Sequence, residues 1–408
     1  MSNRKNFDIV VVGGGLIGAS MACALSHLPL KIAIVEAFPF RSNNQPSYDA
    51  RSIALSYGSK KIFETLKLWQ SLKPDACPIK QIHVSNKGRF GVTRINAHEE
   101  NLEALGYVVE NRIIGNTLLE NISQHKNIEL ICPATLMDID ITEDNAQLTL
   151  SQKEKTRVLN AKLIIGADGA NSKVRELIDI ESSHKDYNQT AIVSNVTPGK
   201  AHDNIAYERF TQQGPIAVLP MTENRCSLVL TTHSDQAESV LALSDTEFLE
   251  HLEQRFGFRS GGFTKTSSRS AYPLTLKRID EHFKHRAIII GNAAHTLHPI
   301  AGQGFNLGLR DVSELAEIIH DATQTGSDIG KKATLKQYQN AREKDQHKTA
   351  LITDNLSNIF SNEFLPLAKA RSKGLFLTDL IPSAKHFIAQ EAMGIRGKLP
   401  KLSRGLPL

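Results

Sequence analysis

Short apolar runs separated by a glycine-rich turn mark the beginning of the chain. Residues 7–12 form one run, residues 31–35 form another, and small residues from Ala19 to Leu25 lie between them. A short apolar run bounded by glycines is typical of a buried strand, and the stretch between the runs has the length of a helix. The pattern predicts a strand–helix–strand unit, the usual beginning of a parallel sheet.

Further along, the pattern changes several times. Residues 129–165 alternate between polar and apolar, which predicts antiparallel strands around a turn at residues 143–145. Short β-like runs over residues 183–273 predict a separate antiparallel sheet, inserted between two halves of the first domain. The apolar run Ala287–Ile290 then predicts a short buried strand, and helical spacing begins at Phe305.

Helical periodicity predicts three other helices. One extends from Ser59 to Leu72 and carries Trp69, and two charged or amphipathic helices cover Ala333–Gln346 and Thr349–Ser372. On its pattern alone, the segment Asp49–Leu55 can be a helix start with a solvated Arg51. We therefore expect a doubly wound α/β domain in two parts, residues 1–182 (with 73–94 contributing to the substrate region) and 274–330, a β-rich substrate domain over 183–273, and a helical region over 331–408.

Composition narrows the class of protein. The 408 residues are 40% apolar and 22% charged with a net charge of +5, which is ordinary for a soluble globular protein. No basic run with interleaved aromatics points to nucleic acid. The four cysteines lie far apart, as in proteins of a reducing compartment. No apolar run approaches the roughly 20 residues that cross a bilayer, so we expect a cytoplasmic protein or one on a membrane face.

The first turn has the spacing Gly-x-Gly-x-x-Gly. Gly13 allows the tight turn, Gly15 lets a pyrophosphate approach the backbone, and Gly18 lets the helix pack on the strand. Glu36 follows at the end of the second strand, where a carboxylate accepts hydrogen bonds from ribose hydroxyls and disfavours a 2′-phosphate. Strand, turn, helix, strand and acid in this order predict a dinucleotide site.

A second candidate segment covers residues 166–175. Asp168 ends an apolar run, and its carboxylate can hold sugar-like hydroxyl groups. The alternative is that Asp168 makes a local turn or caps a helix. Ser172 is placed to cap the helix that carries Arg175.

The third segment, residues 291–311, joins a strand to a helix through a glycine-rich turn. Unpaired backbone N–H groups and the helix N-terminus suit a group that becomes negatively charged. His295 and His298 lie three residues apart, a spacing that is compatible with two ligands of one metal ion. No third candidate ligand lies near them in the sequence. We expect no metal here, and His295 to be a polar residue packed near the cofactor.

These three segments resemble the aromatic-ring flavoprotein monooxygenases, the family of para-hydroxybenzoate hydroxylase. Residues 298–311 resemble the ubiquinone-biosynthesis branch of that family. Within this branch, Gly291-Asn292 and the closing residues 404–408 are similar to the 2-polyprenyl-6-methoxyphenol hydroxylases. The resemblance covers nearly the whole chain and implies FAD as cofactor and NAD(P)H as a transient co-substrate.

The resemblance also implies roles for single residues. Arg51 and Asn111 would lie beside the flavin, and Asn292 would face the ribityl chain where the family usually has aspartate. The carbonyl of Pro299 would lie close to flavin and substrate, and it would position them together with Gly302 and Gly304. No residue of the chain is implied to react covalently. The implied cofactor residues are Gly13, Gly15, Leu16, Ile17, Gly18, Glu36, Arg51, Asn111, Asp168, Asn292, Pro299, Gly302, Gly304, Phe305 and Asn306.

For the substrate, residues 214–220 match the family segment that lines the substrate cavity. Ala217, Leu219 and Pro220, together with Pro299, are the candidates. Small and apolar residues suit an aromatic ring with an apolar tail, and they suit a plain core equally well.

The implied reaction is ring hydroxylation of a polyprenyl phenol in ubiquinone biosynthesis, with O₂ as oxygen source. Two alternatives stay open: a sibling hydroxylase that acts on another ring carbon or another aromatic substrate, and a non-catalytic FAD-bound member of a biosynthetic complex. Residues 371–408 hold seven Lys or Arg against two Asp or Glu. This region is either a helical cap or a surface that meets anionic lipid and other ubiquinone-biosynthesis proteins.

Overall fold

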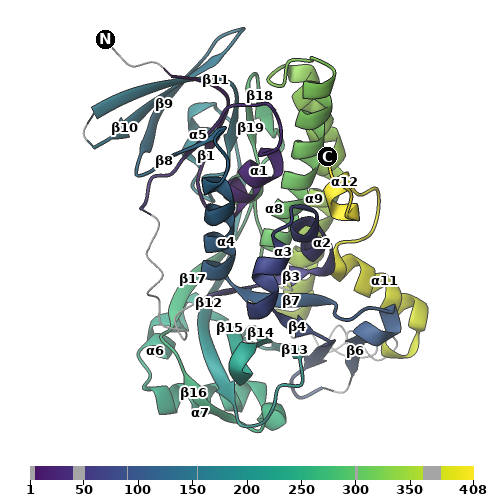
Figure 1. The fold of residues 1–408 in the computed structure, drawn as a ribbon. Coiled ribbons are helices and arrows are strands. Elements are labelled where there is room, and N and C mark those ends of the chain that lie inside the picture. The colour runs from purple at the N-terminus through teal and green to yellow at the C-terminus, as the bar shows by residue number, and fades with distance from the viewer. Residues whose placement is uncertain (1–4, 40–50, 90, 154, 299–301, 362–377) are drawn as a thin grey trace.

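The computed structural model describes residues 5–39, 51–89, 91–153, 155–298, 302–361 and 378–408. Three sheets organise these residues (Figure 1). A mostly parallel sheet lies at one end of the molecule, a large mixed sheet lies at the other, and a small three-stranded sheet lies between them.

The mostly parallel sheet has the order β18-β19-β11-β1-β2-β8, and β9 and β10 extend it from β11. Pairing is parallel from β19 through β8, as the sequence pattern predicts. Its strands are β1 (Lys5–Val12), β2 (Ile32–Val35), β8 (Ile128–Ile131), β9 (Thr135–Ile141), β10 (Ala146–Gln152), β11 (Lys155–Gly166), β18 (Phe283–Lys284) and β19 (Ala287–Ile289).

The two faces of this sheet are covered differently. Helices α1 (Leu16–Leu25), α4 (Asn111–Ser123) and α8 (Gln303–Gln324) share one apolar core with alternate residues of β1 and β2. On the other face, leucines of β9 and β10 and two side chains of α5 (Lys173–Leu177) cover the opposite residues of β1. An antiparallel extension and a short helix therefore cover the face where a second layer of crossover helices would otherwise lie.

The large sheet has the order β20-β17-β12-β15-β14-β13-β5-β6, with β16 beside β12. It is antiparallel except where β13 runs parallel to β5, so the expected antiparallel sheet also takes in strands from the first third of the chain. Helices α6 (Ala237–Leu241) and α7 (Asp245–Phe256) cover one face through an apolar core. The strands are β5 (Gln81–Asn86), β6 (Val92–Asn96), β12 (Ser183–Pro198), β13 (Ile205–Thr211), β14 (Gly214–Met221), β15 (Arg225–His233), β16 (Phe263–Thr266), β17 (Ser270–Arg278) and β20 (His295–Thr296).

The small sheet connects the two large ones. It consists of β3 (Ser52–Ser56), β7 (Gly106–Glu110) and β4 (Cys77–Ile79). Its apolar side chains pack against β14 of the large sheet. A buried ion pair strengthens this junction, because Arg225 of β15 donates to Glu110 at the end of β7 over 2.9 Å.

The described residues of the C-terminal region are mainly helical. The long helix α9 (Lys332–Ser361) packs along α8 and descends toward the large sheet (Figure 1). Helix α11 (Pro382–Met393) packs against β6 and the turn that follows it, and α12 (Lys401–Arg404) returns to α2. Within the described residues, no helix is both long and apolar enough to cross a membrane.

Three expectations about secondary structure are wrong. The single helix over 59–72 is two helices, α2 (Tyr57–Thr65) and α3 (Trp69–Leu72), because Lys67 adopts a positive φ of 60° between them. The helix start over 49–55 is strand β3 in its described part. Helix α9 runs through residues 347 and 348, where two separate helices were predicted. Local spacing does not reveal such breaks and continuities, because tertiary packing decides them.

Candidate functional site

The turn before α1 contains glycines of two kinds. A Cβ on Gly13 would lie 2.4 Å from the Ala167 carbonyl oxygen, and one on Gly18 would lie 1.9 Å from the Gly13 carbonyl oxygen. These two glycines are required by the protein itself. Gly15 has no heavy atom within 4 Å of where its Cβ would be, and it precedes Leu16, the first residue of α1. The open space at a helix N-terminus is where a pyrophosphate binds.

Glu36 lies beside this turn. One of its carboxylate oxygens accepts from Gly14 N over 2.7 Å, and the other accepts from Phe38 N over 2.8 Å. These bonds fix the carboxylate at the end of β2. Each oxygen keeps a second lone pair for a hydroxyl group.

Arg51 and Asn111 come together although they are 60 residues apart. The N–H of Asn111 donates to the Arg51 carbonyl over 2.8 Å. The Asn111 side-chain oxygen is buried and has no hydrogen-bond partner among the described residues. The Arg51 guanidinium donates to the Tyr272 hydroxyl over 3.0 Å and lies over its ring, so β17 also reaches this place.

Asp168 caps a helix. Its carboxylate accepts from the Ser172 hydroxyl and from the backbone N–H groups of Lys173 and Val174 at the start of α5. Ser172 caps the same helix by accepting from Arg175 N over 3.0 Å, as predicted. The capping alternative for Asp168 is therefore realised in the structure.

Arg175 joins the second motif to the third. It is buried, and its guanidinium donates to the carbonyls of Ala293 over 2.7 Å and Ala170 over 3.2 Å. Lys277 of β17 donates to the same Ala170 carbonyl over 2.7 Å. Desolvation and the nearby Arg175 charge lower the pKa of Lys277.

The third motif begins with the short turn Gly291–Ala293, where the Asn292 side chain is exposed. Gly302, at a φ of 61°, then precedes α8. A Cβ on Gly304 would meet nothing within 4 Å, so the first turn of α8 borders a second open space. Phe305 packs on the apolar core below this turn. Pro299 lies outside the described residues.

Asn306 holds the beginning of α8 against β3. Its side-chain oxygen accepts from Ser56 N over 2.9 Å and from the Ser59 hydroxyl over 2.7 Å. Its side-chain NH₂ donates to the Ala54 carbonyl over 2.9 Å and to the Gly302 carbonyl over 2.8 Å. The side chain is therefore used structurally, and only the backbone of this residue is available to a cofactor.

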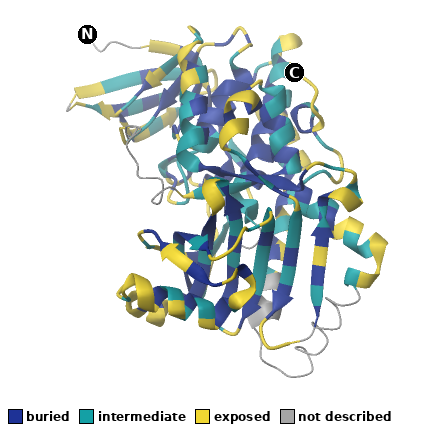
Figure 2. Ribbon diagram, turned by 60° about the horizontal axis from the view of Figure 1, so that its bottom comes forward, coloured by how far each residue is buried: buried dark blue, intermediate teal, exposed yellow. Residues whose placement is uncertain are grey.

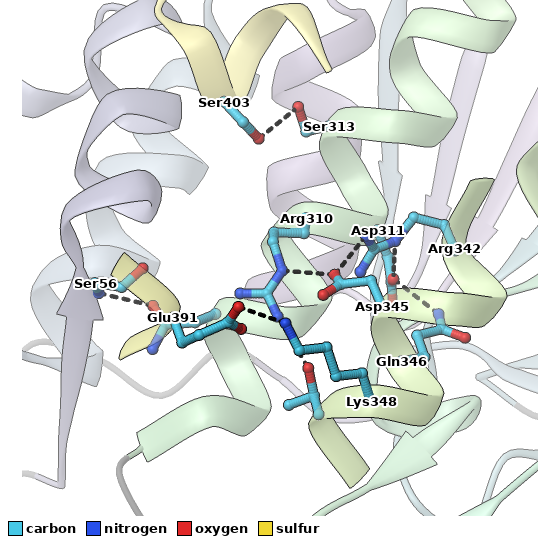
Figure 3. A network of polar contacts seen from close by, with 12 residues as sticks. Ser56, Arg310, Asp311, Ser313, Arg342, Asp345, Gln346, Lys348, Glu391 and Ser403 are labelled. Carbon is cyan, nitrogen blue, oxygen red and sulfur yellow. Dashed lines mark hydrogen bonds and ion pairs between the residues drawn. The ribbon is translucent and has the colours of Figure 1, made fainter. Parts of the chain in front are cut away.

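Asp311, at the end of the third motif, connects α8 to the Gly291 turn, to β20 and to α9. Its fully buried carboxylate accepts from Gly291 N over 3.2 Å and pairs with His295 Nε2 over 2.6 Å. From α9 it accepts from Arg342 Nε over 2.8 Å and from the Gln346 amide over 2.9 Å (Figure 3). The sequence motif ends at this aspartate but gives no sign of its partners on α9.

Neighbouring charges and hydrogen bonds stabilise the ionised Asp311 carboxylate in the core. Burial alone raises the pKa of Asp311, but the charges and hydrogen bonds of His295 and Arg342 hold that pKa well below its usual range. Burial likewise lowers the pKa of Arg342, and the charges of Asp311 and Asp345 more than compensate, so its pKa is raised. The carboxylate stays ionised in the core.

The two histidines of this motif have different partners among the described residues. His295 pairs with Asp311, whereas His298 lies edge-on to Tyr187 and near Gln189 on β12. Burial lowers the pKa of His298 to about 4. Within the described parts of the chain, no three His, Cys, Asp or Glu side chains are grouped to hold a metal ion.

The substrate candidates on β14 divide between two faces. Ala217 and Leu219 point toward the small sheet, where Leu219 packs near Ala54. Pro220 falls on the other face with Ile216 and Val218, which pack toward α7. Side chains alternate along a strand, so Pro220 is not brought together with the other two.

These features fit a bound FAD. Open space at Gly15 and Gly304, two helix N-termini and the unpartnered Asn111 oxygen are what a dinucleotide with a flavin requires. Fold and site together define a dinucleotide-binding flavoprotein. Residues 6–351 match the family model described as FAD binding domain, and the chain belongs to this family.

Similar sequences of known proteins assign the chain to one branch of this family. The chain is 36% identical to "Ubiquinone hydroxylase UbiL" of Rhodospirillum rubrum, covering 100% of this chain and 95% of the relative. It is 30% identical to "3-demethoxyubiquinol 3-hydroxylase" of Escherichia coli, covering 97% and 100%. The resemblance to the ubiquinone-biosynthesis hydroxylases is confirmed, and the chain is an FAD-dependent aromatic-ring monooxygenase.

Solved structures agree on the fold. The p-nitrophenol 4-monooxygenase PnpA of Pseudomonas putida superposes with a TM-score of 0.79 at 18% identity, over 97% of this chain and 100% of that one. PqsL of Pseudomonas aeruginosa, solved in complex with 2-aminobenzoylacetate, has a TM-score of 0.77 at 22% identity, over 92% and 100%. These similarities confirm the expected fold class, an α/β fold with several sheets and a helical C-terminal segment.

The contrast between Gly15 and Gly18 gives a testable prediction. Gly15→Ala adds a methyl group to space that contains no protein atom. We expect the variant to fold and to bind FAD at least about tenfold more weakly, a loss of roughly 1.4 kcal/mol. Fluorescence titration of the FAD-free protein measures the affinity. Gly18→Ala is the control, because its Cβ would collide with Gly13 and should lower the thermal stability of the FAD-free protein. Unchanged FAD affinity in Gly15→Ala would contradict this assignment.

Asp311→Asn gives a second prediction. The change leaves the buried Arg342 with only Asp345 as an anionic partner, and we expect a loss of about 3 kcal/mol in unfolding free energy at neutral pH. Because the folded-state pKa of Asp311 is depressed, its contribution is present above the ordinary aspartate pKa of about 3.9 and is lost as pH falls below it.

Urea unfolding of the FAD-free proteins at several pH values tests this prediction. Wild type and Asp311→Asn should differ at neutral pH and converge in acid. Asp345→Asn is the control, since Asp345 binds the same Arg342 from a side chain that is 35% exposed, and its effect should be smaller. Equal effects of both variants would refute the central role of Asp311.

Proposed function

We propose that this chain uses FAD, NAD(P)H and O₂ to hydroxylate the ring of a polyprenylated methoxyphenol in ubiquinone biosynthesis. One observation carries the proposal. A Cβ on Gly302, at the start of α8, would lie 3.4 Å from the Cβ of Ala54, and Ala54 shares an apolar cluster with Leu219 of β14. The turn that suits a flavin thus lies one side chain away from an apolar surface that suits a substrate ring.

Different residues of the site would bind different parts of FAD and of the substrate. Backbone N–H groups at the starts of α1 and α8 hold the pyrophosphate and the flavin edge, Glu36 takes the ribose, and Arg51 and Asn111 border the flavin. Asn292 and Asp168 would bind the ribityl chain, and Asp168 would do so through what remains of its acceptor capacity beside the helix cap. Bound FAD supplies the redox chemistry by accepting reducing equivalents and activating oxygen. The apolar residues of β14 exclude water and orient the ring.

NAD(P)H and the domain division belong to the same proposal. The sequence has one dinucleotide fingerprint, so the nicotinamide cofactor binds transiently across the FAD domain. Residues 1–182 and 274–330 form that domain, 183–273 supply most of the substrate sheet, and 331–408 add the helical region. Strands β5 and β6 join the substrate sheet from residues 81–96, which supports a contribution of the 73–94 segment.

A sibling reaction is the nearest alternative. Relatives that align over nearly all of the chain include one named for a 3-hydroxylation of demethoxyubiquinol. The same site can therefore serve another ring carbon. A non-catalytic role in a complex is the other alternative, and it predicts FAD binding without turnover.

Isotope labelling tests the function. Purified protein with FAD, NAD(P)H and a short-chain 2-prenyl-6-methoxyphenol should give a product that carries one oxygen atom from labelled O₂, detected by mass spectrometry. NMR of the product identifies the ring carbon. NAD(P)H oxidation that yields only peroxide would argue against this substrate, and bound FAD with no oxidation of NAD(P)H would favour the non-catalytic role.

We also propose that α11 contacts an anionic membrane surface. Phe387 and Ile388 of α11 are exposed, and so are Leu380 and Ile381 directly before the helix. Ala389 and Met393 pack the other side against the protein. The basic excess of residues 371–408 favours anionic lipid over a neutral surface.

Vesicle flotation tests the membrane proposal. The wild type should float with vesicles that contain phosphatidylserine and much less with neutral vesicles. The double variant Phe387→Glu/Ile388→Glu should lose most of this binding, because it places two charges on the apolar face. Phe258→Glu is the control, since Phe258 is also exposed but lies after α7. Binding that survives the double variant would rule out α11 as the contact.

A further inference from the structure

A row of five residues crosses the large sheet on the face turned toward the small sheet. Val193, Val229, Ala217, Glu208 and Val84 stand directly opposite one another on β12, β15, β14, β13 and β5. Each of the five is partly exposed. In Figure 2 the strands of this sheet show partly exposed segments between buried ones.

Packed side chains border this row on both sides. Two residues along the strands in one direction, the neighbouring row is buried throughout and consists of Ala191, Thr231, Pro215, Phe210 and Asn86. In the other direction, Ala206 and Leu219 pack with Ile79 and Val108 of the small sheet. A partly accessible strip that packed side chains border on both sides forms a groove, and we call these five residues the cross-strand groove.

The dimensions of the groove follow from sheet geometry. Four steps between strands span about 19 Å, and neighbouring rows on one face lie about 7 Å apart. At one end the row continues to Ser270 on β17, which is exposed, and at the other to Thr93 on β6, which is buried. A long, narrow, apolar molecule entering from the β17 side matches this shape.

Glu208 is the one charged member of the groove. No other described residue forms a hydrogen bond or ion pair with its carboxylate, and it carries no cross-strand charge partner, because Ala217 and Val84 flank it. Part of the side chain is accessible, yet burial raises its pKa to about 7. A group that water reaches while protein surrounds it lies in a recess.

A lone carboxylate in an apolar recess is costly unless a ligand satisfies it. Ala206 and Phe210 fill the same face two residues away on either side, so the apolar packing along β13 does not itself require a charge at this position. The position is therefore better explained by a ligand than by the fold.

We propose that the cross-strand groove binds the substrate and that Glu208 accepts a hydrogen bond from the hydroxyl group of a phenol ring. The inference rests on the proposed function and deepens it. The small side chain of Ala217 leaves room for the ring next to Glu208, and the valines on either side contact an apolar tail. Leu219, two residues from Ala217, connects this place through Ala54 to the start of α8.

The bond also has a chemical consequence. A carboxylate that accepts the phenol O–H increases electron density on the ring, which favours attack by the ring on an electrophilic oxygen. Glu208 would thus position the ring and select phenols over their O-alkyl ethers, which have no proton to donate. An apolar groove alone cannot make that distinction.

The test compares a short-chain prenylated phenol with its O-methyl ether in FAD-loaded protein. Ligand affinity is read from the flavin absorbance change, and kcat and KM are read from product formation. Glu208→Gln should weaken binding of the phenol by about 10- to 100-fold, the loss of one charge-assisted hydrogen bond. Binding of the ether should change little. Glu208→Asp, which keeps the charge, should retain part of the preference for the phenol.

Two further variants complete the design. Glu250→Gln changes an exposed carboxylate on α7, outside the groove, and should leave both affinities unchanged. Val193→Phe narrows the open end of the groove and should raise KM for a long-tailed phenol more than for a short one. This second variant tests the groove independently of Glu208.

The outcomes separate the groove from the proposed function. If Glu208→Gln keeps the full preference for the phenol, Glu208 does not recognise the hydroxyl and the proposal is overturned, even where turnover is normal. If the wild type binds the phenol through Glu208 but forms no hydroxylated product, the groove stands and the proposed function fails. If the wild type binds neither compound, both fail.

Discussion

The buried carboxylate of Asp311 is the interaction on which the arrangement of the site depends. It reaches the Gly291 turn, the β20 residue His295 and two side chains of α9 at the same time. Removing a charge from water is expensive, and this one is sustained only because its partners are all in place. Asp311 therefore holds the Gly291 turn and β20 in position relative to α8 and α9. Figure 3 shows its contacts with Arg342 and Gln346 of α9.

A second set of polar contacts connects the third motif to the second motif and to the substrate sheet. Arg175 binds the Ala293 carbonyl, which ties α5 and the Asp168 cap to the third motif. Asn306 ties the beginning of α8 to β3, and β3 pairs with β7, whose last residue Glu110 pairs with Arg225 of the substrate sheet. The second motif, the third motif and strand β3 are therefore held in fixed positions relative to the large substrate sheet.

The sequence predicted what depends on near neighbours. Glycines at fixed spacing, an acid after a strand and a serine before a helix are local signals, and the turn at Gly13, the site of Glu36 and the Ser172 cap all follow from them. What it could not predict depends on distant partners. Arg342 lies 31 residues from Asp311 on another helix, and nothing in its own surroundings marks it. Asp168 had two compatible roles, and the structure shows only the capping one.

Pro220 and Glu208 show a different limit. Strand alternation places Pro220 on the face opposite Leu219, so a contiguous segment of β14 does not line a single cavity. Glu208 is an isolated charge between the apolar residues Ala206 and Phe210, a signal that has meaning only once the register with Ala217 and Val84 is known. Register is a tertiary property, so a row across five strands is not visible in any one of them.

The glycines of the site fall into two groups, according to what surrounds the position of the missing Cβ. At Gly13, Gly18 and Gly308 the absent side chain is replaced by protein, since a Cβ there would strike backbone or Ile17 at 1.9 to 2.6 Å. At Gly15 and Gly304 it is replaced by nothing. Packing requires the first group whatever the protein does, whereas no neighbouring protein atom requires the second. The open positions fall at the starts of α1 and α8, so the protein leaves room where two helix N-termini can act on an anionic cofactor.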